Sequence, residues 1–423
     1  MEKINLKNFA WYMLILSALV QVGLILCYDN SQISDAYRYL KLANDVVENG
    51  GIYPLEMHRN DSYIFGSGYV NFAALLLNLF GSVKVVLLAN VLLLLGVALI
   101  LYKIAQQYLS QKIASILLLL FTLYPTNYGI TLYTLTEPLF MFLAFLSFYL
   151  FISGNTRNII LSGIAIALMN TVRPFIPVFI VLIPVAAFLL FKTERIKRIS
   201  LCFLPMILTI AVIGSIHKAT FGDFIYQSST GGVNLMMGAN DDADGSYNDE
   251  VFKEGNIGAL PLPREDMSYA EKDKFWRKQS VEWIKQNPIK WVCLFPKKIF
   301  SLFIHDNHSM AGLAGDMKNR EKYGPSQYVP GLITRFPRYK FFDLVIFYNQ
   351  ALYMAMMALF IHTSVIFIRK RNKLGITLIA WFILTTGLTI VTVGSPRYHY
   401  PLMPIVMLFA AYSLNRLICH EKS

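Results

Sequence analysis

Residues 83–104, VKVVLLANVLLLLGVALILYKI, form the clearest of several long apolar runs in the sequence. A helix needs about 20 predominantly apolar residues to cross the hydrocarbon core of a bilayer, and this run is long enough. Lys103 and Lys112 lie at and just beyond its end. Basic residues in short links indicate the cytoplasmic side, so the direction in which this run crosses decides the topology of the rest of the chain.

The composition agrees with a membrane protein. The chain has 423 residues, of which 55% are hydrophobic and only 15% charged, and its mean hydropathy is +0.48. Soluble domains are typically about 25% charged, and a core this large would leave too little polar material to cover it. A bilayer removes that difficulty because lipid solvates the apolar surface. We therefore predict an all-α polytopic membrane protein with about ten transmembrane helices.

A single orientation fits the basic residues of every link. Two lysines precede the apolar run 9–28, which places the N-terminus in the cytoplasm. If the apolar segment 63–80 also spanned, the next run would cross outward and every later basic link would be inverted. We therefore predict that 68–80 forms a helix lying in the outer interface. The predicted spans are 9–28, 83–104, 113–125, 138–152, 159–172, 175–191, 200–217, 342–368, 374–391 and 402–418.

This topology divides the chain into three parts. Residues 1–217 form an N-terminal transmembrane module with a first outer loop at 29–82, residues 218–341 form an outer-face loop domain, and residues 342–423 form C-terminal transmembrane helices. Both termini are then cytoplasmic. The net charge of +12 is explained by the cytoplasmic links, so we expect no nucleic-acid partner.

The outer-face loop domain carries two predicted helical segments. Residues 269–287 are predicted to form an amphipathic helix that ends before Pro288, and residues 291–304 form an apolar stretch that fits the membrane interface. An acidic run at 241–254 lacks the spacing and closing Glu of an EF-hand loop, so a solvated loop is the simplest interpretation.

Charged residues at the edge of a membrane domain are costly unless they are used or paired, and four such places lie on the outer side. The first is residues 34–39, SDAYRY. Ser34 is predicted to cap a helix and Asp35 to lie in its first turn. Asp35, Arg38 and Tyr39 then share one face through their i, i+3 and i+4 spacing. A plain capped helix start would contain the same residues.

The second and third places are corners between spans. In residues 134–138, TLTEP, proline suits the first turn of a helix and Thr136 or Glu137 is able to cap it. In residues 171–174, TVRP, Arg173 lies where two spans meet outside. It is placed either to bind an anion or to extend toward lipid headgroups.

The fourth place is residues 394–401, GSPRYHYP, at the outer end of the penultimate span. Arg397, Tyr398 and His399 lie between two prolines there, and proline restricts the backbone of such a turn. The planar guanidinium of arginine matches the oxygens of a phosphate. We therefore predict that Arg397, Tyr398 and His399 bind an anionic substrate.

The sequence assigns no metal ligands. His305 and His308 lie three residues apart, but no further ligand pattern accompanies them. No cofactor is required, although a divalent metal remains an open alternative. The remaining chemistry is that of carboxylates, guanidiniums and tyrosines near the outer surface.

Taken in order, these places resemble the GT-C glycosyltransferases, in the branch of the protein O-mannosyltransferases and the aminoarabinose transferases of lipid A. The resemblance rests on the segments SDAYRYLKLANDVVENGGIYP, TLTEP, SGIAIALMNTVRP, STGGVNLMMGANDDADGSY and GSPRYHYPLMP. One feature departs from the pattern. Many relatives carry two adjacent acidic residues in the first outer loop, whereas Asp35 is followed by Ala36.

The resemblance implies an inverting glycosyltransferase that moves a sugar from a polyprenyl-phosphate donor to an acceptor hydroxyl on the outer, periplasmic face. Asp35 is then the general base. Arg397, together with Arg173, holds the leaving lipid phosphate. Glu137 orients the acceptor or a cation near Asp35. The acceptor is a glycan, a lipid or a protein.

Two other functions fit parts of the sequence. An O-antigen polymerase or ligase-type enzyme is also polytopic with a large outer loop. A lipid-linked-sugar flippase or transporter would place ionisable residues near the bilayer midplane and broken helices in paired halves, whereas charge here collects at the outer edge. We predict a bacterial inner (plasma) membrane protein.

Overall fold

A computed structural model of the chain describes residues 5–261, 263–314 and 341–420, and within these ranges every regular element is a helix. Six segments are long and apolar enough to cross a membrane. This confirms the predicted all-α polytopic architecture. The six are α1 (Leu6–Cys27), α4 (Val83–Tyr108), α10 (Arg195–Phe221), α17 (Phe341–Arg369), α18 (Lys373–Val391) and a run made of α19 (Pro396–His399), η5 (Tyr400–Leu402) and α20 (Met403–His420).

The other predicted spans are shorter apolar helices. The longest of them, α8, has 17 residues and measures about 26 Å at 1.5 Å per residue, slightly less than the roughly 30 Å hydrocarbon core. Where an interfacial helix was predicted, the chain forms α3, whose position relative to a bilayer stays a prediction. The short helices are α3 (Ser67–Phe80), α5 (Gln111–Leu123), α7 (Glu137–Ile152), α8 (Thr156–Val172) and α9 (Ile176–Leu190).

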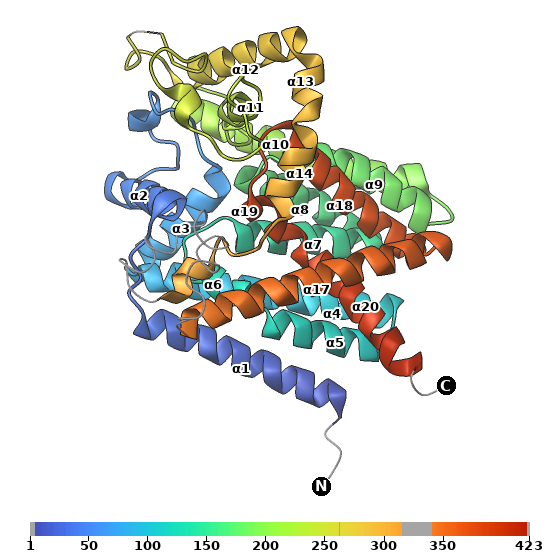
Figure 1. Cartoon of the computed structure of the whole chain (residues 1–423). Helices are drawn as coiled ribbons and strands as arrows, with labels where there is room; N and C mark the ends of the chain where they lie inside the picture. Colours follow the sequence, from blue (N-terminus) through green and yellow to red (C-terminus); the bar gives the residue numbers. More distant parts are fainter. Residues whose placement is uncertain (1–4, 262, 315–340, 421–423) are drawn as a thin grey trace.

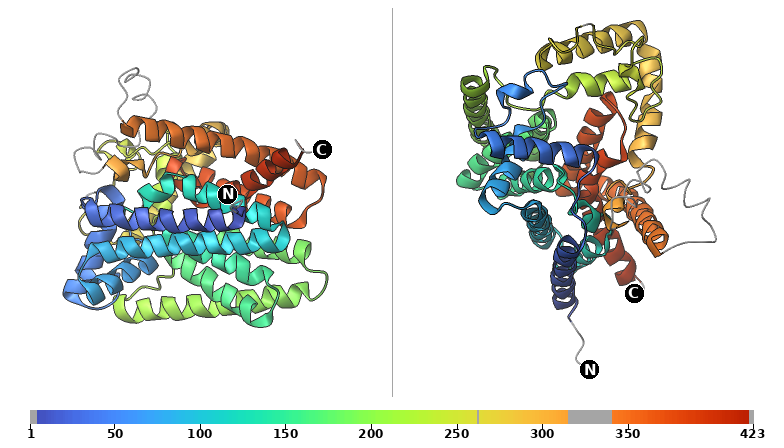
Figure 2. Two further views of the ribbon diagram at one scale, coloured as in Figure 1. Left: turned by 90° about the horizontal axis from the view of Figure 1, so that it is seen from below. Right: turned by 90° about the vertical axis from the view of Figure 1, so that its left-hand side faces the viewer.

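The helices lie side by side in one bundle with a continuous apolar core that extends from α1 to α20 (Figures 1 and 2). Helix α2 (Ser34–Asn49) lies with α3 at one end of the bundle, and the C-terminus of α20 lies at the other (Figure 1). The loop segment after α10 folds into a small helical layer beside α2. Its elements are α11 (Gly231–Gly238), α12 (Tyr269–Gln286), α13 (Pro288–Cys293) and α14 (Phe295–Phe303).

The sequence predicted this layer in part. The amphipathic helix at 269–287 is confirmed as α12, and a capping box between Ser268 and Glu271 fixes its start. The predicted apolar stretch 291–304 instead belongs to two helices that meet at Leu294. Pro296 has no N–H to donate, which favours a break at that place. As a result α14 turns back and packs on α18 and α19.

The start of α2 corrects one prediction. Ser34 does not cap the helix, because it is the first helical residue and has φ of 51°. The preceding Gln32 instead fixes this turn, since its Oε1 accepts a hydrogen bond from the backbone N–H of Thr134 at 2.8 Å. The Thr134 hydroxyl in turn donates to the carbonyl of Ala36 at 2.6 Å. Contacts between distant segments therefore hold this end of α2 against the corner that leads into α7.

Close packing of α8 on α10 depends on Gly163. A Cβ at this position would lie 2.0 Å from the carbonyl oxygen of Cys202, so the two helices would have to separate. Small residues commonly permit such close approach in membrane bundles. We expect Gly163→Ala to destabilise the protein by roughly 1–3 kcal/mol, measured as thermal unfolding in detergent.

The matched control is Gly387→Ala in α18, where a Cβ would meet open space. This change should leave the unfolding temperature unchanged or raise it, because alanine favours a helix more than glycine does. Equal stability of Gly163→Ala and the wild type would contradict the packing argument.

Candidate active site

Four charged side chains from distant parts of the chain form one cluster. Asp35 comes from the start of α2, Glu137 from the start of α7, Arg173 from the corner after α8, and Arg397 from α19. Arg397 Nη1 lies 2.6 Å from Asp35 Oδ2, and Arg397 Nη2 lies 3.3 Å from Glu137 Oε2. Arg173 Nη2 lies 2.7 Å from Glu137 Oε1. All four places singled out in the sequence therefore contribute to one site.

Glu137 is the buried centre of the cluster. It is fully buried and accepts hydrogen bonds from both guanidiniums, including one from Arg397 Nε. Thr136 does not cap α7 with its side chain, and its hydroxyl instead accepts from Arg173 Nε at 2.9 Å. A charge in this position is tolerated only when it is paired and hydrogen-bonded. Glu137 thus orients both arginines.

This geometry corrects the predicted catalytic role of Glu137. Its side chain does not line the cavity next to the cluster and is not exposed to it. The carboxylate is too deeply enclosed by Arg173 and Arg397 to contact an acceptor or a cation. Glu137 is therefore placed to orient Arg173 and Arg397 and not to contact a molecule in the cavity.

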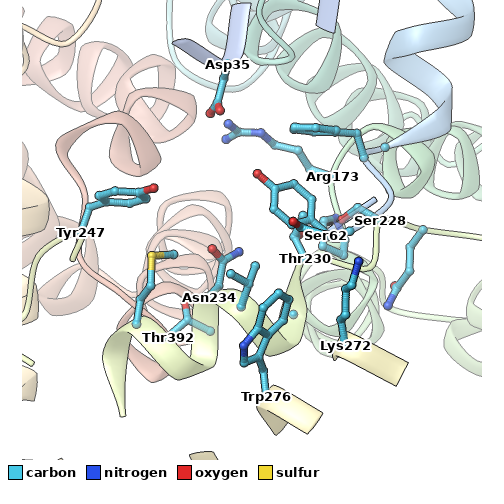
Figure 3. A pocket seen from close by; sticks show the side chains of 18 of the residues that line it. Asp35, Ser62, Arg173, Ser228, Thr230, Asn234, Tyr247, Lys272, Trp276 and Thr392 are labelled. Atoms are coloured by element: carbon cyan, nitrogen blue, oxygen red, sulfur yellow. Dashed lines mark hydrogen bonds between the residues drawn. The ribbon is translucent and has the colours of Figure 1, made fainter. Parts of the chain in front are cut away.

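Asp35 faces open space. Its side chain is 39% exposed, whereas that of Arg397 is 9% exposed. Both line a cavity of about 850 Å³ that also contacts Arg173. In Figure 3 the carboxylate of Asp35 and the guanidinium of Arg173 both point into this cavity. The cluster therefore presents one carboxylate and two guanidiniums to any bound molecule.

Three other predicted residues also line the cavity: Arg38, Tyr39 and Tyr398. Arg38 Nη1 donates to the hydroxyl of Tyr63 at 2.9 Å, which holds this exposed side chain at the cavity wall. Burial, together with the nearby carboxylate of Asp35, raises the pKa of Tyr39. The Tyr39 phenol therefore stays protonated and cannot serve as a base near neutral pH.

His399 was predicted to bind substrate, and the structure contradicts this. The imidazole is fully buried and does not line the cavity. Its Nδ1–H donates to the carbonyl of Leu302 at 2.5 Å, and its Nε2 lies 3.5 Å from Asp306 Oδ1. Neighbouring residues of the short helix α19 point in different directions. Arg397 and Tyr398 therefore reach the cavity, while His399 packs behind it.

The residues that the loop layer contributes to the cavity were not predicted from the sequence. They include Asn234, Tyr247 and Trp276, and they face the cluster from α11, α12 and the segment between these helices. Tyr247 is the last residue of the segment STGGVNLMMGANDDADGSY, which forms part of the family resemblance, so the sequence contained a signal for it. Nothing in the local sequence marked Asn234 or Trp276, because only the packing of α11 on α12 brings them to this surface.

The donor set does not fit a divalent cation. Asp35 and Glu137 are the carboxylates of the cluster, and both accept hydrogen bonds from Arg397. Magnesium and calcium need several oxygen ligands, and within the described residues no three His, Cys, Asp or Glu side chains are grouped for a metal. Two guanidiniums also repel a cation. The arginines supply the positive charge at this site.

Comparisons with known proteins give a clear result only for structure. Neither protein-family models nor curated protein sequences match the chain. The archaeal oligosaccharyltransferase AglB from Archaeoglobus fulgidus, in complex with an inhibitory peptide and a dolichol-phosphate, matches with a TM-score of 0.51 and 14% identity, over 98% of this chain and 51% of that one. The Archaeoglobus fulgidus oligosaccharyltransferase complex with Zn and sulfate matches with a TM-score of 0.50 and 16% identity, over 96% and 49%.

A third structure, ArnT from Cupriavidus metallidurans bound to undecaprenyl phosphate, has a TM-score of 0.47 and 10% identity, over 96% of this chain and 60% of that one. The chain spans about half the length of the two oligosaccharyltransferase structures. At these identities the likeness shows the fold, and chemistry has to be argued from the site.

The buried position of Glu137 gives a prediction on stability. Glu137→Ala would leave Arg173 and Arg397 without their shared partner, and breaking a buried ion pair typically costs about 3–5 kcal/mol. We expect a large fall in the thermal unfolding temperature of the purified protein. The control Glu194→Ala removes an exposed carboxylate that pairs with Lys197, and it should leave that temperature nearly unchanged. A stable Glu137→Ala protein would show that the cluster does not depend on this carboxylate.

Proposed function

Because the chain has the fold of the GT-C glycosyltransferases, we propose that it is an inverting glycosyltransferase. It transfers a sugar from a polyprenyl-phosphate donor to an acceptor hydroxyl. The observation that carries this proposal is the pairing of Asp35 with Arg397 at the wall of a large cavity. A carboxylate for proton removal and guanidiniums for a phosphate are thereby held together.

The arginines suit the phosphate of the donor. Arginine has five N–H groups, and Arg397 uses one on each of its three nitrogens for Asp35 and Glu137. Among the described residues, no side chain or carbonyl accepts a hydrogen bond from Nη1 of Arg173. N–H groups of both arginines thus remain for phosphate oxygens, and charge-assisted hydrogen bonds of this kind are strong. The dolichol-phosphate bound to the structurally similar AglB supports a lipid phosphate as the ligand.

The transfer step then follows from the geometry. Asp35 removes the proton of the acceptor hydroxyl while the acceptor oxygen forms a bond to the anomeric carbon of the sugar. The bond from that carbon to the phosphate oxygen breaks, and its electron pair leaves with the polyprenyl phosphate. Arg173 and Arg397 stabilise the negative charge that grows on this leaving group. Glu137 keeps both guanidiniums oriented during the step.

The distribution of basic links supports a reaction on the outer side of the membrane, and we propose that this membrane is a bacterial inner membrane. In this arrangement the helices of 1–217 and 342–423 form the catalytic membrane module, and the polyprenyl tail lies against them. Residues 218–341 select the acceptor. Both chain termini then lie in the cytoplasm.

The proposal is tested by sugar transfer from radiolabelled polyprenyl-phosphate hexoses and pentoses, using the full chain in lipid and an extract of cell-envelope acceptors. We expect Asp35→Asn to bind the donor but to lose about 10²–10⁴-fold in transfer rate. The control Glu48→Gln removes an exposed carboxylate from the same helix and should keep full activity. Full activity of Asp35→Asn would remove Asp35 from the mechanism.

Inactivity of the wild type with every donor would contradict the enzyme class. In that case uptake of the labelled lipid-linked sugar into sealed vesicles distinguishes a transporter, because transport moves the donor across the membrane without breaking its sugar–phosphate bond. Either result identifies the class without relying on the variant.

The paired carboxylates also predict metal independence. Arg397 forms ion pairs with both Asp35 and Glu137, so these carboxylates are not free to bind a metal. We therefore expect EDTA to leave the transfer rate unchanged, and added Mg²⁺ or Mn²⁺ to have no effect. The rate is measured with protein dialysed against EDTA and then with each metal restored. Loss of activity that a metal restores would overturn the role of the arginines as the source of positive charge.

A further inference from the structure

The cavity extends well beyond the charged cluster. Its volume of about 850 Å³ is near the upper end of the roughly 300–1,000 Å³ usual for ligand pockets, and one sugar ring at Asp35 would leave much of it empty. Figure 3 shows Asp35 and Arg173 at one end and Trp276 with Lys272 toward the other. The second end is built by the loop layer and has a different chemistry. We call this end, which is lined by Ser62, Ser228, Thr230, Asn234, Lys272 and Trp276, the distal half.

Uncharged polar groups line the distal half. Ser62, Ser228, Thr230 and Asn234 all face the cavity. Within the described part of the chain the side-chain amide of Asn234 has no hydrogen-bond partner, and the hydroxyls of Ser228 and Thr230 contact only each other, at 3.0 Å. Together these side chains offer both donors and acceptors to a ligand.

Two of the charged residues that line this part of the cavity are already paired within the protein. Lys272 donates to the carbonyls of Asn60 at 2.5 Å and Asp61 at 3.4 Å, and Arg277 pairs with Asp273 at 2.6 Å. Both cations are held by protein oxygens, so they do not require an anionic ligand. The other charged side chains that line the cavity here are one cation, Arg264, and two carboxylates, Asp249 and Glu265. This balance does not favour an anion, so the distal half is better matched to a neutral molecule.

Aromatic rings complete this surface. The indole N–H of Trp276 donates to the carbonyl of Gly258 at 2.9 Å, so the indole's hydrogen-bonding need is met within the protein. Tyr247 is 61% exposed and projects into the cavity between Asp35 and Trp276, so it borders both ends (Figure 3). An exposed tyrosine loses little conformational entropy when a flat ligand stacks on it, because it has only two side-chain torsions.

We propose that the distal half binds a neutral sugar unit of the acceptor, so that the acceptor is a glycan. This rests on the proposed function, because it takes the Asp35 end of the cavity as the site of transfer. A sugar ring has a face of C–H groups that packs on an aromatic ring and an edge of hydroxyls that both donate and accept. The exposed ring of Tyr247 matches the face, and Asn234, Ser228 and Thr230 match the edge, while the buried Trp276 forms part of the wall behind them.

Direct binding tests the proposal without any transfer reaction. The probes are neutral di- and trisaccharides of glucose, mannose and N-acetylglucosamine, titrated against the full chain in lipid nanodiscs and followed by saturation-transfer NMR. We expect at least one probe to bind the wild type. Tyr247→Ala and Asn234→Ala should each weaken binding by about tenfold, whereas Tyr247→Phe, which keeps the ring, should bind like the wild type.

Tyr37→Ala is the matched control, since Tyr37 is 56% exposed on α2 and does not line the cavity. It should bind the sugar normally. The proposal is overturned if no saccharide binds, if both distal variants bind as well as the wild type, or if a peptide binds there in place of a sugar. Saccharide binding by a protein that discharges no donor would reject the proposed transferase and leave the sugar subsite standing.

Discussion

The buried carboxylate of Glu137, shared by Arg173 and Arg397, is the interaction on which the functional end of this molecule depends. An isolated charge in such a position costs several kcal/mol, so the site is stable only when all three side chains are present together. The three come from α7, the corner after α8, and α19. Because the two arginines and the carboxylate need one another, these three helix ends are held together around the Glu137 carboxylate.

Asp35, at the start of α2, joins this cluster through its ion pair with Arg397. Its carboxylate contacts Arg397, and the hydrogen bonds of Gln32 with Thr134 hold the start of α2 against the same corner. The carboxylate that faces the cavity and the one that is buried consequently have different tasks. In the proposed function, the exposure of Asp35 allows it to contact a substrate, whereas burial restricts Glu137 to orienting the arginines.

The two ends of the cavity differ in the chemistry of the side chains that line them. The membrane helices contribute charge that is concentrated, paired and rigid, which suits a phosphate. The loop layer contributes hydroxyls, an amide and the exposed ring of Tyr247, which suit a neutral ligand. Sites held on helices are more precise than sites on loops, and under the proposed function the chemistry lies on the bundle and recognition on the loop layer.

The sequence by itself determined the all-α membrane architecture and the four polar corners, because hydropathy and helix-end chemistry are local properties. It also indicated that Asp35 and Arg397 belong to one site. Only the tertiary structure decided that Glu137 is enclosed by Arg173 and Arg397, and that His399 turns away from the cavity. The ion pairs of Arg397 join residues 260 and 362 positions apart. Whether a side chain faces a cavity or a core depends on how the helices pack, which no local pattern encodes.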